Sequence, residues 1–233
     1  MDFRRGFHDG LAIGLGYLSV SFSFGILAVR MGLSWWQAVI VSFANLTSAG
    51  QVAGIGIMSA SGGLIEMMVS QLVINMRYSL MSISLSQKAD SSLNTAGRFM
   101  TAHFITDEIF GVAYSRPEKL SRSHMFGIAV LPVIGWTSGT LLGAVCGAIL
   151  PAIITEALTI GIYGMFVAIV LPVSRKDKAV MTVSIIAVVL SVIFFYVPAL
   201  KDNISSGFAV IICSVIAAGA GAVFMPKEEE ING

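Results

Sequence analysis

The chain contains 233 residues, of which 56% are hydrophobic and only 12% are charged, against roughly 45–50% and about 25% in ordinary soluble domains. This composition excludes an intrinsically disordered chain, which combines low hydrophobicity with high net charge. It argues against a soluble globular domain, because a chain of this length has too little interior to bury so much apolar surface. A net charge of +1 gives no basic footprint for nucleic-acid binding. The sequence therefore predicts an all-α integral membrane protein.

Seven segments are long and apolar enough to cross a bilayer, which takes about 20 predominantly apolar residues. They are 10–29, 35–58, 64–86, 125–149, 151–172, 179–198 and 204–225. An eighth segment, 98–115, is shorter and more polar. If it also crosses, most lysines and arginines outside the spans fall on the same side as the N-terminus, which the positive-inside rule makes cytoplasmic. We therefore expect a polytopic bundle of seven to eight transmembrane helices, forming a single domain over 1–233.

The second span is unusually polar in its middle. Residues 45–56 combine Asn45, Thr47, Ser48 and Gln51 with three glycines. Such side chains prefer helix caps, and glycine permits backbone that a straight helix does not use. We predict an interrupted helix whose free N–H groups attract a carboxylate, as in transporters, with these four side chains binding the substrate. The structural alternative is close helix packing through small residues.

Polar side chains also gather in the third span. Gln71, Asn75 and Tyr78 share one helical face by their i, i+4, i+7 spacing, and Arg77 lies near the middle of the span. A buried guanidinium at membrane depth needs a carboxylate or several carbonyl partners. We expect Asn75 and Tyr78 to contact the substrate; the alternative is that Arg77 belongs to a purely structural ion pair.

The segment 98–115 carries the chemistry that a proton-coupled step needs. His103 and Asp107 are i, i+4 neighbours, and Glu108 follows directly. Two adjacent carboxylates at membrane depth cannot both be comfortable as anions. We interpret His103, Asp107 and Glu108 as proton-coupling residues, with either carboxylate available to Arg77. The alternative is an interfacial helix with solvated charges.

Four glycines recur at every fourth position, at Gly135, Gly139, Gly143 and Gly147. On a helix they form one smooth face that lets another backbone approach closely, so we assign them to helix packing. Cys146 and Cys213 lie in apolar runs, which is typical of small buried side chains. No cluster of histidines and cysteines has metal-ligand spacing, so we expect no metal and no cofactor.

Several short motifs, taken together, resemble the AzlC family, the large subunit of branched-chain amino acid exporters. In chain order they are Phe24-Gly25-Ile26-Leu27-Ala28, Ala49-Gly50-Gln51, Asn75-Met76-Arg77-Tyr78, Thr106-Asp107-Glu108 and Trp136-Thr137-Ser138-Gly139-Thr140-Leu141-Leu142-Gly143. The resemblance spans most of the chain. Where the family commonly has Gly-Ala-x-Gln, this chain has Ser48-Ala49-Gly50-Gln51, a difference that alters pocket size.

The resemblance implies a permease of the bacterial plasma membrane that exports leucine, isoleucine, valine or methionine. It also implies a small hydrophobic AzlD-type partner and export driven by the proton gradient. In this interpretation the substrate carboxylate meets half-helix N–H groups and Gln51, while Asp107 or Glu108 carries the proton and Arg77 adjusts its pKa.

Two other function classes compete with a transporter. A membrane-embedded enzyme would need a nucleophile, a base and an oxyanion or metal arrangement, and the sequence offers no nucleophile elbow or ligand set, so we expect no enzyme. A non-transporting scaffold or assembly subunit would suit the glycine faces. It predicts that alanine at Gln51, Asn75 and Asp107 together would be tolerated. A channel is disfavoured because no ring of like charge repeats around a pore axis.

Overall fold

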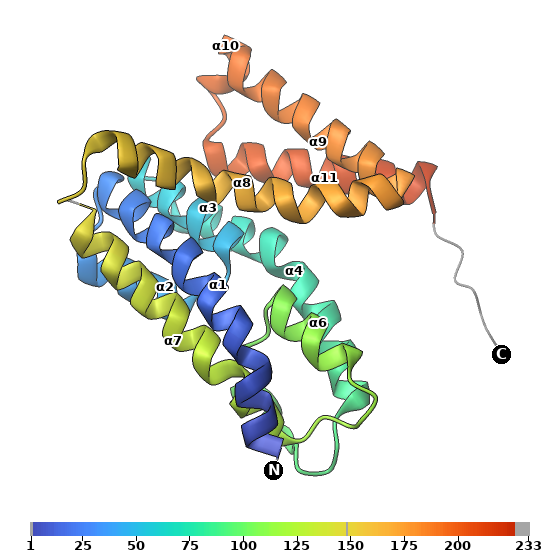
Figure 1. Ribbon diagram of the computed structural model, residues 1–233. Helices are drawn as coiled ribbons and strands as arrows, with labels where there is room; N and C mark the ends of the chain where they lie inside the picture. The colour runs from blue at the N-terminus through green and yellow to red at the C-terminus, as the bar shows by residue number, and fades with distance from the viewer. Residues whose placement is uncertain (1, 148, 227–233) are drawn as a thin grey trace. The chain divides into compact units, whose positions relative to one another are not determined.

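The computed structural model describes residues 2–147 and 149–226, and its secondary structure is helical (Figure 1). In chain order the described helices are α1 (Asp2–Arg30), α2 (Trp35–Ala44), α3 (Ser48–Ser59), α4 (Leu64–Lys88), α5 (Thr95–Ala102), α6 (Asp107–Ser115), α7 (Arg122–Cys146), α8 (Ala152–Lys176), α9 (Lys178–Tyr196), α10 (Pro198–Lys201) and α11 (Ser206–Phe224). The chain divides into two compact units. The first unit is 1–55 with 74–162, and the second unit is 56–73 with 163–233.

Among the described residues, five helices are long and apolar enough to cross a membrane, namely α1, α7, α8, α9 and α11. The expected number of seven to eight is therefore not confirmed. The difference lies in the polar spans. The segments 35–58 and 98–115 each form two short helices with a break between them, and α4 is 25 residues long but more polar.

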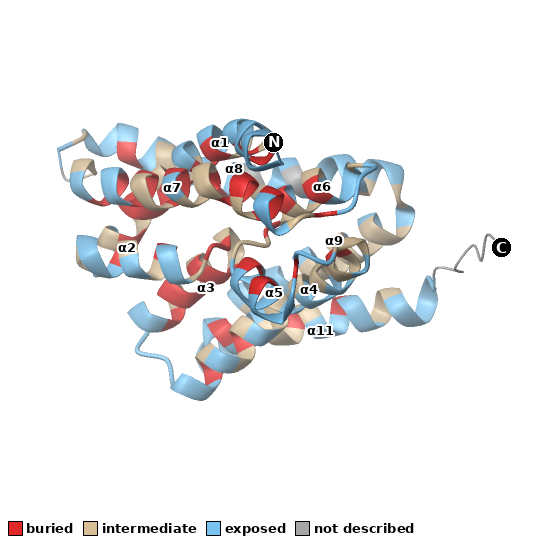
Figure 2. Ribbon diagram, turned by 90° about the horizontal axis from the view of Figure 1, so that it is seen from below, coloured by how far each residue is buried: buried red, intermediate tan, exposed pale blue. Residues whose placement is uncertain are grey.

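The first unit is organised around α1 and α7, which lie side by side and run parallel. Gly135 faces the backbone of Gly14, and Gly143 faces the backbone of Phe22 farther along both helices. A Cβ atom at either α7 glycine would collide with the α1 backbone, so the small residues permit the close approach. Buried residues follow the length of both helices (Figure 2).

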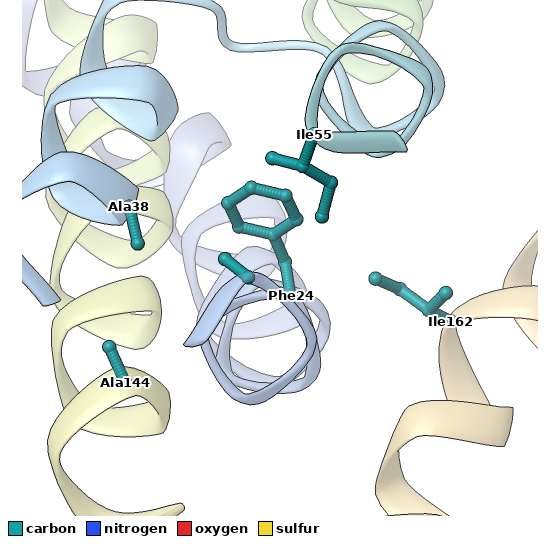
Figure 3. Packing of buried hydrophobic residues seen from close by; sticks show 6 residues of the cluster. Phe24, Ala38, Ile55, Ala144 and Ile162 are labelled. Carbon is teal, nitrogen blue, oxygen red and sulfur yellow. The ribbon is translucent and has the colours of Figure 1, made fainter. Parts of the chain in front are cut away.

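Helices α2 and α3 form a helical hairpin. Ala38 of α2 and Ile55 of α3 pack into the same cluster as Phe24 of α1, and Figure 3 shows them on either side of its ring. Leu46, in the break between the helices, packs instead with Tyr17, two turns earlier on α1. The chain therefore runs back beside α1 through α2, turns at 45–47, and returns through α3. This confirms the expected interruption, while the expectation that 35–58 crosses the membrane is not confirmed.

Helices α5 and α6 form a second hairpin, which enters from the opposite end of α1 and α7. The segments before α5 and after α6 are paired: Leu120 N donates to Lys88 O and Asp90 N donates to Leu120 O, each at 2.9 Å. Phe104, in the break between the helices, packs against the cluster around Tyr17. Because the chain enters and leaves at the same end, the expectation that 98–115 crosses the membrane is not confirmed.

The second unit contains the start of α4 together with α9, α10, α11 and most of α8. The start of α4 carries a buried carboxylate, Glu66, which is only 6% exposed. The Glu66 carboxylate accepts hydrogen bonds from Ser205 Oγ at 2.5 Å and from the backbone N–H of Gly207 at 3.0 Å. An acidic group at the beginning of α11 satisfies an N–H that has no partner within the helix and favours the helix dipole.

Candidate functional site: two helix breaks that meet

The breaks of the two hairpins meet in the interior of the first unit. Leu46 from the first break and Phe104 from the second pack around the same pair of aromatic residues, Tyr17 of α1 and Trp136 of α7. The rings of this pair lie 4.9 Å apart, edge to face. His103, at the end of α5, has its Nε2 at 3.1 Å from the backbone carbonyl oxygen of Phe43, in the last turn of α2. Two interrupted helices are thus joined at mid-length of α1 and α7.

The Tyr17 hydroxyl connects α1 to the beginning of α6. It lies 2.7 Å from Thr106 Oγ1 and 2.5 Å from Glu108 Oε2. Thr106 is the N-cap of α6, since its hydroxyl also accepts the backbone N–H of Ile109. A threonine cap followed by Asp107 and Glu108 explains why a helix starts here, because acidic side chains in the first turn are stabilised by the helix dipole.

The neighbouring carboxylate has a different partner. Asp107 Oδ2 lies 2.8 Å from a guanidinium nitrogen of Arg77, which also donates to the Tyr78 hydroxyl at 3.1 Å. The sequence predicted that a carboxylate of this segment would pair with Arg77, and the structure shows Asp107 in that position. The side chains are 43% and 32% exposed, so the pair is partly accessible. Within the described residues Glu108 forms no ion pair, and its hydrogen-bond partner is Tyr17.

Gln51, in the first turns of α3, is the most deeply buried of the predicted polar residues, at 1% exposure. Its Oε1 accepts a hydrogen bond from the indole N–H of Trp136 at 3.3 Å. Among the described residues its Nε2 has no hydrogen-bond partner. The side chain therefore presents an unsatisfied donor next to the two breaks.

The remaining predicted residues lie at the first break, apart from Asn75. Asn45 ends α2, and Ser48 is the first residue of α3. Thr47, in the break, accepts the backbone N–H of Gly50 at 3.4 Å and so caps α3. Asn75 lies on α4 and is partly buried. The first unit thus contains every residue predicted for substrate binding and proton coupling.

Two residues at the centre were not predicted from the sequence as site residues, Tyr17 and Trp136. A signal for Tyr17 was present: it lies on the buried α1 face that also carries Gly10, Gly14 and Ser21. Trp136 lies inside the glycine-rich motif that we interpreted as packing alone. Each lies on a helix face that also carries buried glycines.

These features define a polytopic helical membrane protein in which two broken helices meet at a polar, partly buried centre. The chain belongs to the AzlC family: the AzlC protein family matches residues 12–150. It is 26% identical over 238 residues to the inner membrane protein YgaZ of Escherichia coli, covering 98% of this chain and 94% of that protein.

Two further relatives are known only as uncharacterized membrane proteins. One from Archaeoglobus fulgidus is 29% identical over 172 residues, covering 73% of this chain and 75% of that protein. One from Helicobacter pylori is 30% identical over 150 residues, covering 63% and 64%. No solved structure matches the chain. The match at 12–150 includes both helix breaks and the Tyr17–Trp136 pair.

Proposed function

We propose that this chain is a secondary transporter that exports branched-chain or similar small apolar amino acids (leucine, isoleucine, valine, methionine) across the bacterial plasma membrane without altering them chemically. The observation that carries the proposal is the meeting of two broken helices around Gln51, Glu108 and Tyr17. Broken helices place backbone N–H groups and ionisable side chains at membrane depth, where transporters bind substrates and ions. The proposed export is proton-coupled and requires a small AzlD-type subunit.

The basic residues support a cytoplasmic N-terminus. Arg30 lies at the end of α1, whereas most lysines and arginines of the first unit lie at the end where α1 and α7 begin. These are Arg4, Arg5, Lys88, Arg98, Arg116, Lys119 and Arg122. By the positive-inside rule that end faces the cytoplasm. The α5–α6 hairpin then enters from the cytoplasm and the α2–α3 hairpin from the outside.

The substrate contacts follow from the chemistry of a zwitterion with an aliphatic side chain. Its carboxylate binds the beginning of α3, where Thr47 and Ser48 start the helix, and the amide of Gln51. Asn45, Asn75 and Tyr78 supply further polar contacts. Leu46 and Phe104 provide apolar surface at the breaks for the aliphatic group.

Glu108 is the proposed proton carrier. The positive charge of Arg77 compensates Asp107, whereas Glu108 has a neutral hydroxyl as its partner. Glu108 is also exposed, so a proton can reach its carboxylate without breaking an ion pair. Arg77 and Asp107 hold the start of α6 against α4, and His103 links this hairpin to the other.

The test is counterflow of radiolabelled amino acids into proteoliposomes, with and without an AzlD-type protein and with an imposed pH gradient. We expect saturable leucine flux that depends on the gradient and on the partner. Absence of flux for every apolar amino acid, with the partner present, would refute the proposal.

Matched variants separate the two carboxylates. Glu108→Gln is expected to uncouple flux from the pH gradient, while Asp107→Asn reduces flux but keeps its pH dependence. Unchanged pH-dependent flux in Glu108→Gln would exclude it as the carrier. If alanine at Gln51, Asn75 and Asp107 together left partner assembly and cell function intact, a non-transporting scaffold would replace the transporter.

A further inference from the structure

The contact between Trp136 and Gln51 fixes which end of the amide faces the indole. An indole nitrogen is a hydrogen-bond donor and never an acceptor, whereas a glutamine amide has one end of each kind. The atom of Gln51 that faces Trp136 Nε1 at 3.3 Å is therefore Oε1. The NH₂ group is left over by chemical necessity, and it carries two donors.

That NH₂ group lies where an unsatisfied donor is costly. Gln51 is 1% exposed, and its Nε2 has no hydrogen-bond partner among the described residues. Leaving a buried donor without a partner is destabilising, because the group has lost its hydrogen bonds to water. An acceptor supplied by a ligand would remove this cost, while a cationic or donor group would add to it.

We propose that Trp136 is a positioning residue, which holds the Gln51 amide as a donor so that the site binds the carboxylate end of its substrate. The inference rests on the proposed function and deepens it, because it assigns one end of the amino acid to one side chain. Trp136 does not touch the substrate in this role. It prevents the amide from turning its oxygen toward the ligand, where it would repel a carboxylate.

The same arrangement predicts specificity. A ligand that keeps the ammonium group and aliphatic side chain of leucine but has an alcohol in place of the carboxylate loses the charge-assisted bond to Nε2. Hydrogen bonds to charged groups are stronger than neutral ones. Leucine should therefore bind at least about tenfold more tightly than leucinol, the corresponding alcohol, which is about 1.4 kcal/mol.

The experiment measures ligand-induced thermal stabilisation of the purified full-length protein with leucine and with leucinol. In Trp136→Phe the leucine affinity should fall about tenfold, and the leucinol affinity should stay unchanged. Gln51→Glu should abolish the preference for leucine, because a carboxylate replaces the donor; it also tests the contact if Trp136→Phe does not fold. The matched control is Thr140→Val on the same helix, which removes a buried hydrogen bond to Ser42 and should keep the preference.

A spectroscopic signature adds a readout that a merely structural role would not move. Trp35 and Trp36 are about half exposed and Trp136 is 3% exposed, so replacing the first two by phenylalanine isolates the buried indole. Leucine, but not leucinol, should shift its emission, and Gln51→Leu should remove that shift.

The outcomes separate the inference from the proposed function. An unchanged leucine-to-leucinol ratio in folded Trp136→Phe or Gln51→Glu would overturn the inference while leaving transport untouched. A wild-type protein that prefers leucine as described but moves none in proteoliposomes would overturn the proposed function alone. A wild-type protein that binds neither compound would overturn both.

Discussion

The two units of the molecule bury their helices very differently. Half of the most apolar stretch of α7, in the first unit, is buried inside the protein, while none of the corresponding stretch of α9, in the second unit, is buried. Gly143 of α7 lies against the α1 backbone, whereas a Cβ added to Gly219 of α11 would meet no atom within 4 Å. The first unit is held together by close contacts between its own helices, and the second unit exposes apolar side chains suited to contact with lipid.

The contrast extends to chemistry. The first unit carries the helix breaks, the Arg77–Asp107 pair and the Tyr17–Trp136 centre, and it contains most of the family match at 12–150. In the second unit the described buried carboxylate is Glu66, which binds the start of α11. Burying polar groups in a membrane protein is costly. The first unit gathers them at its candidate functional site, whereas in the second unit Glu66 holds another helix in place.

The largest effect should come from filling the α1–α7 contact. Gly143→Leu forces a side chain into the backbone of Phe22 and should lower the free energy of unfolding by about 3 kcal/mol. The measurement is thermal unfolding in detergent followed by circular dichroism. Gly219→Leu is the matched substitution in the second unit and should be close to neutral. Equal losses in both variants would break the comparison.

The next effect tests the polar contact of the second unit. Glu66→Ala removes the acceptor for Ser205 and Gly207 and should cost about 2 kcal/mol, with faster hydrogen–deuterium exchange at the start of α11. Glu156→Ala, at an exposed position, is the control and should change neither quantity. Unaltered exchange in Glu66→Ala would show that this carboxylate does not hold α11.

A smaller effect is expected at the centre of the first unit. Tyr17→Phe keeps the ring against Trp136 but removes the hydroxyl between Thr106 and Glu108, which should cost about 1 kcal/mol and impair transport. Tyr163→Phe, with 52% of the residue exposed, should alter neither stability nor flux. Full activity of Tyr17→Phe would exclude its hydroxyl from the site.

The smallest expected effect is a change in the pKa of Asp90, in the loop between α4 and α5. The Ser92 hydroxyl and N–H bind the Asp90 carboxylate and lower its pKa. Because the folded-state pKa is depressed, the stability contributed by Asp90 is present above its unfolded pKa and is lost as pH falls through the folded value. Ser92→Ala should raise the Asp90 pKa toward its ordinary range, measured by NMR titration of the carboxyl carbon. The neighbouring Ser91→Ala should leave that pKa unchanged, and a shift there would contradict the assignment.

Much of the helical content and part of the candidate site could be predicted from the sequence. The break near 45–56 followed from cap-forming side chains in mid-span, and the pairing of Arg77 with a carboxylate of 98–115 followed from the cost of an isolated charge at depth. The glycine repeat indicated a close helix contact but gave no indication of α1 as the neighbour. Tyr17 and Trp136 were missed because an aromatic residue in an apolar helix is usually packing.

The sequence alone determined that this is a helical membrane protein and that polar groups interrupt a helix near 45–56, since these depend on local composition and on the cost of burying charge. It did not indicate the second break, between α5 and α6. Only tertiary contact decided the direction of the chain after each break. Hydropathy indicates whether a segment is apolar and long enough to enter the membrane. It does not indicate whether the segment crosses the membrane or turns back. Pairing of Lys88 with Leu120, far apart in the sequence, shows that α5 and α6 return, and it brings Glu108 to Tyr17.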